Sequence, residues 1–155
     1  GEWHLIAQLF LVSAHLIPPW PNIDHSFSFL YIVLHLSGIF LSIAGIFHTI
    51  KAFSDLGSSL TPLPEPKINA PLVITNSYKY CRHPLYKGLL LLSAGVSIYL
   101  ISLVHLLLLI ILAIILRLKA KREETKLTSI HPYYTDYMKN TVAILPIIRF
   151  LDWRG

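Results

Sequence analysis

Residues 88–119 read GLLLLSAGVSIYLISLVHLLLLIILAIILRLK, an apolar stretch that ends only at a basic cluster. At about 1.5 Å per residue, one helix of this length would exceed the roughly 30 Å hydrocarbon core of a bilayer. We therefore predict two helices, at about 84–100 and 103–128, joined by a tight turn. The stretch contains no proline and a single interior glycine, Gly95, so its composition does not mark the turn more closely.

The composition favours a membrane protein. Of the 155 residues, 54% are hydrophobic and 14% are charged, and the mean hydropathy is +0.60. A soluble domain of this size could not bury that much apolar surface, so the bilayer is the expected solvent. Two further apolar stretches, at about 3–17 and 27–50, predict two more helices. We therefore expect residues 1–155 to form a single all-α integral membrane domain with about four transmembrane helices.

The distribution of the 13 lysines and arginines supports this topology. If the N-terminus is cytosolic, the loop at 18–26 and the turn at 99–103 lie outside, and neither contains Lys or Arg. All basic residues then lie in cytosolic segments, as the positive-inside rule predicts. We expect a multi-pass protein with both termini in the cytosol, in the plasma membrane of a prokaryote or the endoplasmic reticulum of a eukaryote. This arrangement explains the net charge of +5 without nucleic acid as a partner.

A polar cluster, YKYCRHPLYKG at residues 78–88, precedes the third predicted helix. Pro84 suits the first turn of a helix, which places His83 near the N-cap. The free N–H groups of that turn, with Arg82 beside them, would suit a carboxylate or a phosphate. The alternative is an interfacial anchor, because Tyr, Arg and Lys are common at helix ends at the level of the lipid headgroups.

A second cluster, RLKAKREETKLTSIHPYYTDY at residues 117–137, follows the last predicted crossing. Helical spacing places Glu123 on the apolar, packed face and Glu124 on a solvated stripe with Lys121 and Arg117. A carboxylate on the packed face needs a partner, so Glu123 is a functional candidate. A charged helix end with local ion pairs is the alternative interpretation.

The topology brings both clusters to the cytosolic ends of adjacent helices. The tail, at about 131–150, is too short to span and is expected to lie at the interface or to re-enter the bilayer. We expect a cytosolic pocket formed by the RHPxY helix start, the Glu-Glu helix end and this tail. Such a pocket suits a zwitterionic, nucleotide-like ligand, since carboxylates and aromatic faces attract a sulfonium and Arg82 would bind an α-carboxylate.

These residues resemble the signature of the isoprenylcysteine carboxyl methyltransferase and phospholipid methyltransferase superfamily, small integral membrane enzymes that use S-adenosylmethionine. The signature is a tyrosine followed by Arg-His-Pro-x-Tyr-x-Gly, and after a helical hairpin a Glu-Glu pair, two tyrosines and a proline; the resemblance covers about residues 45–146. Asn76 stands where the family usually has glycine, and we expect the turn to be kept because asparagine tolerates positive φ. The cofactor-binding residues that the resemblance implies are Tyr78, Arg82, His83, Pro84, Tyr86, Gly88, Glu123, Glu124, Tyr134 and Tyr137.

The resemblance implies S-adenosylmethionine-dependent methyl transfer to a lipophilic, membrane-embedded acceptor, such as an isoprenylcysteine-type carboxylate or a similar small lipid that enters sideways between helices. Catalysis would rest on alignment and exclusion of water. A carboxylate acceptor requires no base, and Arg117 or Arg122 would position it. An amine, as in a phospholipid N-methyltransferase, must first lose a proton, with Glu123 or His83 as the base.

Three alternatives stay open. A sterol-reductase-like enzyme that uses NADPH shares a related C-terminal architecture but is normally much longer. A non-catalytic membrane scaffold would bind no cofactor. The third alternative, a haem-binding electron carrier, is suggested by the histidines in apolar segments, His4, His15, His35, His48 and His105.

The single cysteine, Cys81, gives no cysteine-based metal site, and we expect no metal site formed by the protein's own side chains.

Overall fold

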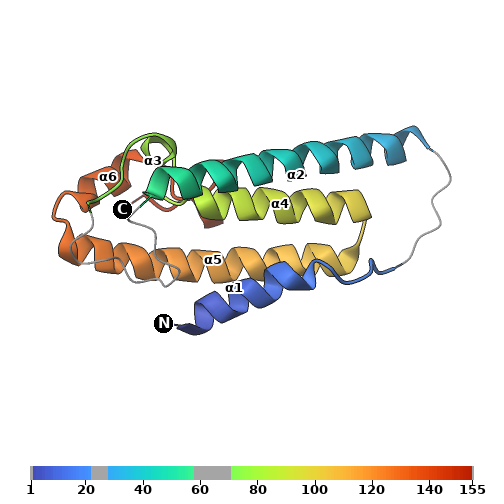
Figure 1. The fold of residues 1–155 in the computed structure, drawn as a ribbon, viewed down its shortest axis with the longest axis horizontal. Coiled ribbons are helices and arrows are strands. Elements are labelled where there is room, and N and C mark those ends of the chain that lie inside the picture. The colour runs from blue at the N-terminus through green and yellow to red at the C-terminus, as the bar shows by residue number, and fades with distance from the viewer. Residues whose placement is uncertain (1, 22–27, 58–70, 155) are drawn as a thin grey trace.

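The structure is a computed structural model that describes residues 2–21, 28–57 and 71–154. Within these residues the chain is helical and contains no β-strand. The four longest helices form an elongated bundle in which α4 lies between α2 and α5, and α1 packs against α5 (Figure 1). The helices are α1 (Glu2–Ala14), α2 (Phe29–Leu56), α3 (Ser77–Tyr80), α4 (Pro84–Leu100), α5 (Leu103–Ile130) and α6 (Tyr134–Asn140), followed by the short 3₁₀ helix η2 (Arg149–Leu151).

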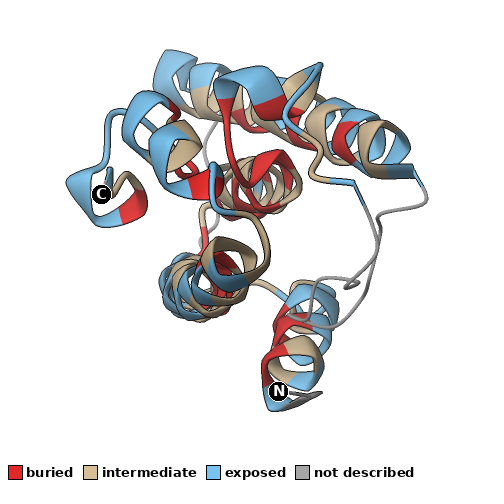
Figure 2. Cartoon of the chain, turned by 90° about the vertical axis from the view of Figure 1, so that its left-hand side faces the viewer, coloured by how far each residue is buried: buried red, intermediate tan, exposed pale blue. Residues whose placement is uncertain are grey.

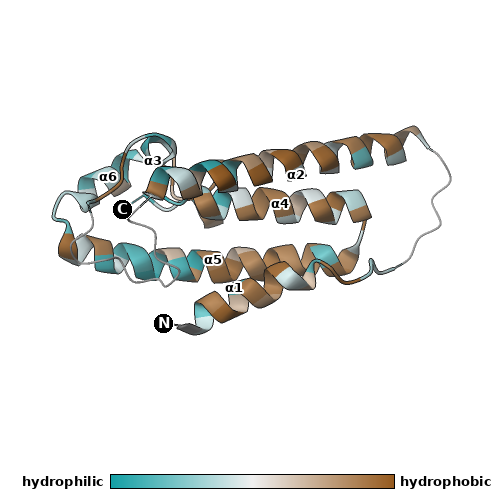
Figure 3. Ribbon diagram, viewed as in Figure 1, coloured by the Kyte–Doolittle hydropathy of each residue, from teal (hydrophilic) through white to brown (hydrophobic). Residues whose placement is uncertain are grey.

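Helices α2 and α5 are each 28 residues long and apolar enough to cross a membrane, whereas α1 and α4 are shorter apolar helices. Only 11% of the apolar window of α2 is buried inside the protein. Buried residues, red in Figure 2, lie on the faces of the helices that are turned toward one another. Hydrophobic residues, brown in Figure 3, make up much of the four long helices, and many of them are exposed. Soluble proteins rarely expose so much contiguous apolar surface to water, so this surface indicates a membrane protein.

The turn between α4 and α5 lies where the sequence predicts it. Helix α4 ends at Leu100 and α5 begins at Leu103. Ile101 adopts the left-handed conformation, with φ 46° and ψ 48°, which reverses the chain in two residues. The hydroxyl of Ser102 then caps α5 by accepting a hydrogen bond from the backbone N–H of His105 at 3.5 Å. A single serine cap therefore specifies the break that the composition left open.

The other helix ends differ from the predicted bounds. Helix α1 ends at Ala14, before the predicted residue 17, and the chain continues in hydrogen-bonded turns toward Pro18. Helix α2 continues past residue 50 to Leu56, and Gly57 ends it with φ 49°. The predicted tail segment, 131–150, contains the seven-residue α6 and then irregular backbone. Lys51 and Asp55 lie within α2, so the charged residues near its end did not mark where the helix stops.

Four glycines set the distance between α2 and α4. Gly38 and Gly45 of α2 face Gly95 and Gly88 of α4. A Cβ atom added to Gly45 would lie 2.4 Å from the backbone nitrogen of Leu92, so any side chain there would push the helices apart. Close contact through small residues is a common way for helices to pack in a bilayer.

Replacing Gly45 by leucine should separate α2 from α4. We expect Gly45→Leu to lower the free energy of unfolding by about 1–3 kcal/mol or more, because overpacking forces backbone shifts. The matched control is Ser54→Leu, which adds a leucine at an exposed position of the same helix. Thermal unfolding in detergent measures both variants, and equal effects would contradict the role assigned to Gly45.

Candidate functional site

The tail returns from α6 to the start of α4. The backbone N–H of Arg82 donates to the carbonyl of Val142 at 2.8 Å, and the N–H of His83 donates to the carbonyl of Ala143 at 3.0 Å. Pro84 is the first residue of α4 and His83 is its N-cap, as the sequence predicts. The main-chain pairing therefore fixes the tail beside the first turn of α4.

Arg82 connects this helix start to three other segments. Its buried guanidinium donates from Nε to Glu124 Oε1 at 2.7 Å, which forms an ion pair with α5. Nη1 donates to the carbonyls of Met138 and Thr141 at 2.5 and 2.7 Å, and Nη2 donates to the carbonyl of Trp153 at 2.5 Å. Four of its hydrogen bonds thus go to protein groups, so Arg82 holds the site together. The predicted contact of Arg82 with a ligand carboxylate stays a prediction.

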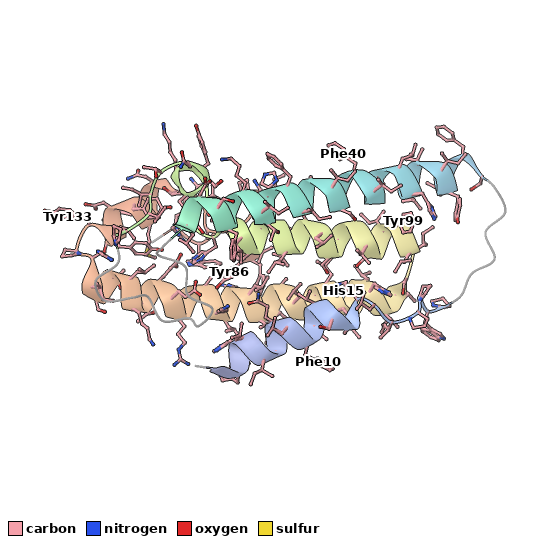
Figure 4. All side chains as sticks on the ribbon, viewed as in Figure 1. Phe10, His15, Phe40, Tyr86, Tyr99 and Tyr133 are labelled. Atoms are coloured by element: carbon pink, nitrogen blue, oxygen red, sulfur yellow. The ribbon has the colours of Figure 1, made fainter. Side chains whose placement is uncertain are left out.

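His83 lies between the two carboxylates of α5. Its Nε2 is 2.8 Å from Glu124 Oε1, and its Nδ1 is 3.5 Å from Glu123 Oε2. Both ring nitrogens face carboxylate oxygens, which favours the doubly protonated imidazolium. Burial acts to lower the pKa of His83, but its interactions with Glu123 and Glu124 outweigh burial and raise that pKa above 6.5. The hydroxyl of Tyr86, a residue labelled in Figure 4, donates to Glu123 Oε1 and completes the cluster; the two oxygens are 2.5 Å apart.

The prediction that Glu124 is solvated is wrong, and Glu123 is partly exposed rather than fully packed. Glu124 is buried by Arg82, His83 and Trp153, whose Nε1 donates to Glu124 Oε2 at 2.6 Å. The side chain of Glu123 is 20% exposed. The helical pattern treats α5 as an isolated helix, whereas these partners come from α4 and the tail. Glu123 is therefore the carboxylate of the pair that a ligand could reach.

The three predicted tyrosines of the α3–α6 region pack the tail. Tyr134 is buried, and its ring centroid is 5.5 Å from that of Tyr137. The hydroxyl of Tyr137 donates to the backbone carbonyl of Tyr78. Burial raises the pKa of all three hydroxyls, so they stay protonated and uncharged. Asn76, just before α3, has φ 55°, which confirms the expectation that asparagine keeps this turn.

Other predicted site residues lie outside this cluster. Gly88 faces α2, where an added Cβ would lie 2.6 Å from the backbone nitrogen of Thr49, so helix packing accounts for its small size. Arg117 contacts the tail, with Cζ 4.2 Å from the ring centroid of Phe150. Arg122 is half-buried on α5, and within the described residues no hydrogen bond or ion pair joins it to the cluster.

The sequence analysis missed Trp153 and the pair formed by Lys119 and Gln8. Lys119, buried on α5, donates from Nζ to Gln8 Oε1 of α1 at 2.9 Å and lies 5.3 Å from the ring centroid of Tyr86. This contact links α1 to the cluster. The position of Trp153 between Asp152 and Arg154 could have marked it as a site residue. The helical spacing of α5 contains no feature that would have predicted the contact of Lys119 with Gln8.

A comparison with protein families identifies the chain. The family described as phospholipid methyltransferase matches residues 33–133, which run from α2 to the start of the tail and include His83, Glu123 and Glu124. The chain belongs to the phospholipid methyltransferase family. The resemblance deduced from the motifs is confirmed, and this family is part of the same membrane methyltransferase superfamily. Comparisons of this methyltransferase-family chain with curated proteins and with solved structures gave no significant match.

The two glutamates of this methyltransferase-family protein should differ in their contribution to stability. Glu124→Gln leaves the guanidinium of Arg82 buried without a charged partner, and we expect a loss of about 3–5 kcal/mol. Glu123→Gln, at a partly exposed position, should cost about 1 kcal/mol or less. Thermal unfolding without ligand measures both, and a Glu123→Gln variant as unstable as Glu124→Gln would contradict the assignment.

His83 should make stability depend on pH. Because its folded pKa is raised, the native state binds this proton more tightly than the unfolded chain does. The resulting stabilisation is fully present below the unfolded pKa of 6.5 and is lost as the pH rises through the folded pKa. We expect the unfolding temperature of the wild type to fall over that range and that of His83→Gln to fall less. If the unfolding temperatures of the wild type and of His83→Gln changed in parallel with pH, the assigned ion pairs of His83 with Glu123 and Glu124 would be contradicted.

Proposed function

We propose that this protein transfers the methyl group of S-adenosylmethionine to a lipophilic acceptor held in the bilayer. The observation that carries the proposal is the cluster of His83, Tyr86 and Glu123, which lies within the segment that matches the phospholipid methyltransferase family. The cluster leaves one carboxylate partly exposed beside an aromatic ring and an imidazolium. These groups are suited to a ligand that carries both a positive and a negative charge.

The membrane placement in this proposal has α1, α2, α4 and α5 in the bilayer and the cluster at its cytosolic face, with both termini in the cytosol. Helices α2 and α5 are long enough to span. Helix α4, with 17 residues, is about 26 Å long at 1.5 Å per residue, close to the thickness of the hydrocarbon core. Both chain ends lie toward the end of the bundle that carries α3 and α6, which supports a common side (Figure 1).

The chemistry of the cluster fits S-adenosylmethionine, which when bound supplies a methyl group on a sulfonium. Glu123, whose carboxylate is partly exposed, would hold a sulfonium, because opposite charges attract. Both ring nitrogens of His83 already face Glu123 and Glu124, so His83 would act on the cofactor indirectly, by holding Glu123 in place. Glu124 and Arg82 act indirectly, since their contacts hold the tail and His83 in place. The tyrosines at positions 134 and 137 act in the same way through packing.

The acceptor class depends on the protonation of the cluster. An ammonium headgroup must lose a proton before its nitrogen can attack a methyl group. Glu123 is the base in this proposal, because its carboxylate is partly exposed, whereas both ring nitrogens of the buried His83 already face carboxylate oxygens. Glu123 and the family match both favour a phospholipid amine. An isoprenylcysteine-type carboxylate, which needs no base, is the second candidate, because Arg117 lies near the site with a buried donor nitrogen for such an anion.

Binding of S-adenosylhomocysteine to detergent-purified protein tests the cofactor. We expect binding by calorimetric titration that Glu123→Gln weakens at least tenfold, or about 1.4 kcal/mol, through loss of the negative charge. Asp136→Asn is the matched control, because that carboxylate is 79% exposed on α6. A folded wild type that binds neither S-adenosylhomocysteine nor S-adenosylmethionine would contradict the proposed function.

Transfer of radiolabelled methyl groups distinguishes the two acceptor classes. We expect phosphatidylethanolamine to be methylated, with Glu123→Gln lowering kcat because the base is lost. A farnesylcysteine derivative serves as the carboxylate arm. Methylation of that compound alone, with no dependence of its kcat on Glu123, would contradict the assignment of Glu123 as base and support the second candidate.

A further inference from the structure

Arg117 is the first charged residue after the apolar run of α5 at 103–116, and its guanidinium lies against the tail. The Cζ atom is 4.2 Å from the ring centroid of Phe150 and 5.6 Å from that of Trp153. The Nε atom is buried and has no hydrogen-bond partner among the residues that the structure describes. The proposed methylation of a phospholipid amine leaves this donor unused, and only the second candidate acceptor, a carboxylate, would engage it.

Stacking on the two rings does not satisfy Nε. An aromatic ring contacts the face of a guanidinium, whereas the N–H groups point outward in its plane. Buried donors without an acceptor are rare in native proteins, and each one calls for an explanation such as a missing ligand. Nε and a neighbouring Nη nitrogen together match two oxygens of a phosphate or carboxylate. The geometry therefore indicates an anion with two adjacent oxygens.

The surroundings of Arg117 indicate that this anion belongs to a lipid. The residue follows directly on the membrane-spanning part of α5, at the level expected for lipid headgroups. Lys121, one turn further along α5, lies 5.7 Å from the same ring of Trp153 and adds a second positive charge. In the adjacent tail, Ile147 is 93% exposed and Phe150 is 41% exposed, which supplies apolar surface for acyl chains.

We propose that Arg117, Phe150 and Trp153 form a binding site for the phosphate group of a phospholipid, and that the bound lipid holds the tail on α5. The site is additional to the proposed methyl-transfer cluster and rests only on the membrane placement in that proposal. Arg117 lies within the segment that matches the family, whereas Phe150 and Trp153 lie outside it.

The lipid site is coupled to the cluster through Trp153. The indole of Trp153 donates to Glu124, and its backbone carbonyl accepts from Arg82. A lipid that fixes Trp153 therefore also fixes the carboxylate that holds His83. Binding of the lipid and binding of the cofactor should consequently strengthen each other.

Native mass spectrometry of the detergent-purified protein tests the lipid site without any cofactor. The probe is phosphatidylglycerol, with diacylglycerol as a phosphate-free lipid and glycerol 3-phosphate as a phosphate without acyl chains. We expect phosphatidylglycerol to bind, and Arg117→Gln to weaken binding at least tenfold. The matched control is Arg149→Gln, which removes an exposed arginine of the same tail and should change affinity less than twofold.

Three results would overturn the proposal. The first is unchanged lipid binding in Arg117→Gln, and the second is an equal loss in Arg149→Gln, which would indicate general attraction between charges. The third is binding of glycerol 3-phosphate as tight as that of the lipid, which would indicate a site for soluble phosphate. Phe150→Ala keeps every charge and should also weaken lipid binding, so the test stands even if Arg117→Gln does not fold.

The coupling is measured separately as the affinity for S-adenosylhomocysteine with and without phosphatidylglycerol. We expect the lipid to tighten binding several-fold in the wild type and to have no effect in Arg117→Gln. A lipid site that forms in a protein without cofactor affinity would contradict the proposed function alone. Cofactor binding that ignores a bound lipid would contradict the coupling through Trp153.

Discussion

The ion pair between Arg82 and Glu124 is the contact on which the rest of the site depends. It joins the start of α4 to the C-terminal part of α5, and the same two side chains bind the backbone and the indole of the tail. A buried ion pair is costly unless its remaining donors and acceptors are also satisfied. Here the additional hydrogen bonds of Arg82 and Glu124 meet that requirement, and the resulting network specifies one arrangement of segments that are far apart in sequence.

The position of this ion pair is set by the packing of α2 against α4. Glycines on both helices allow the two backbones to approach closely, so α4 cannot slide or rotate without a clash. The first turn of α4 is thereby held at the height of the Glu-Glu pair on α5. Helix α4 lies between α2 and α5 (Figure 1). The packing of α4 on α2 therefore also positions the residues that α4 presents to α5.

Local signals in the sequence predicted the features that depend on local structure. Proline at the start of α4 and the positive φ of Asn76 follow from the conformational preferences of single residues, whereas the length of the apolar stretch predicted the turn at Ile101. The exchange of roles between Glu123 and Glu124 could not be predicted, because Arg82 and Trp153 approach α5 from distant parts of the chain. The seven-residue spacing of glycines, shared by α2 and α4, was a readable signal that the sequence analysis did not use.

The proposed lipid site at Arg117 would add a second functional surface to the same tail. The central claim remains that the tail, fixed by Arg82 and Glu124, completes a cofactor site around Glu123. An experimental structure with bound S-adenosylhomocysteine tests this claim most directly. The account predicts the ligand against Glu123, Tyr86 and His83 with the ion pair between Arg82 and Glu124 intact. A ligand bound elsewhere, or a displaced tail with this ion pair broken, would contradict it.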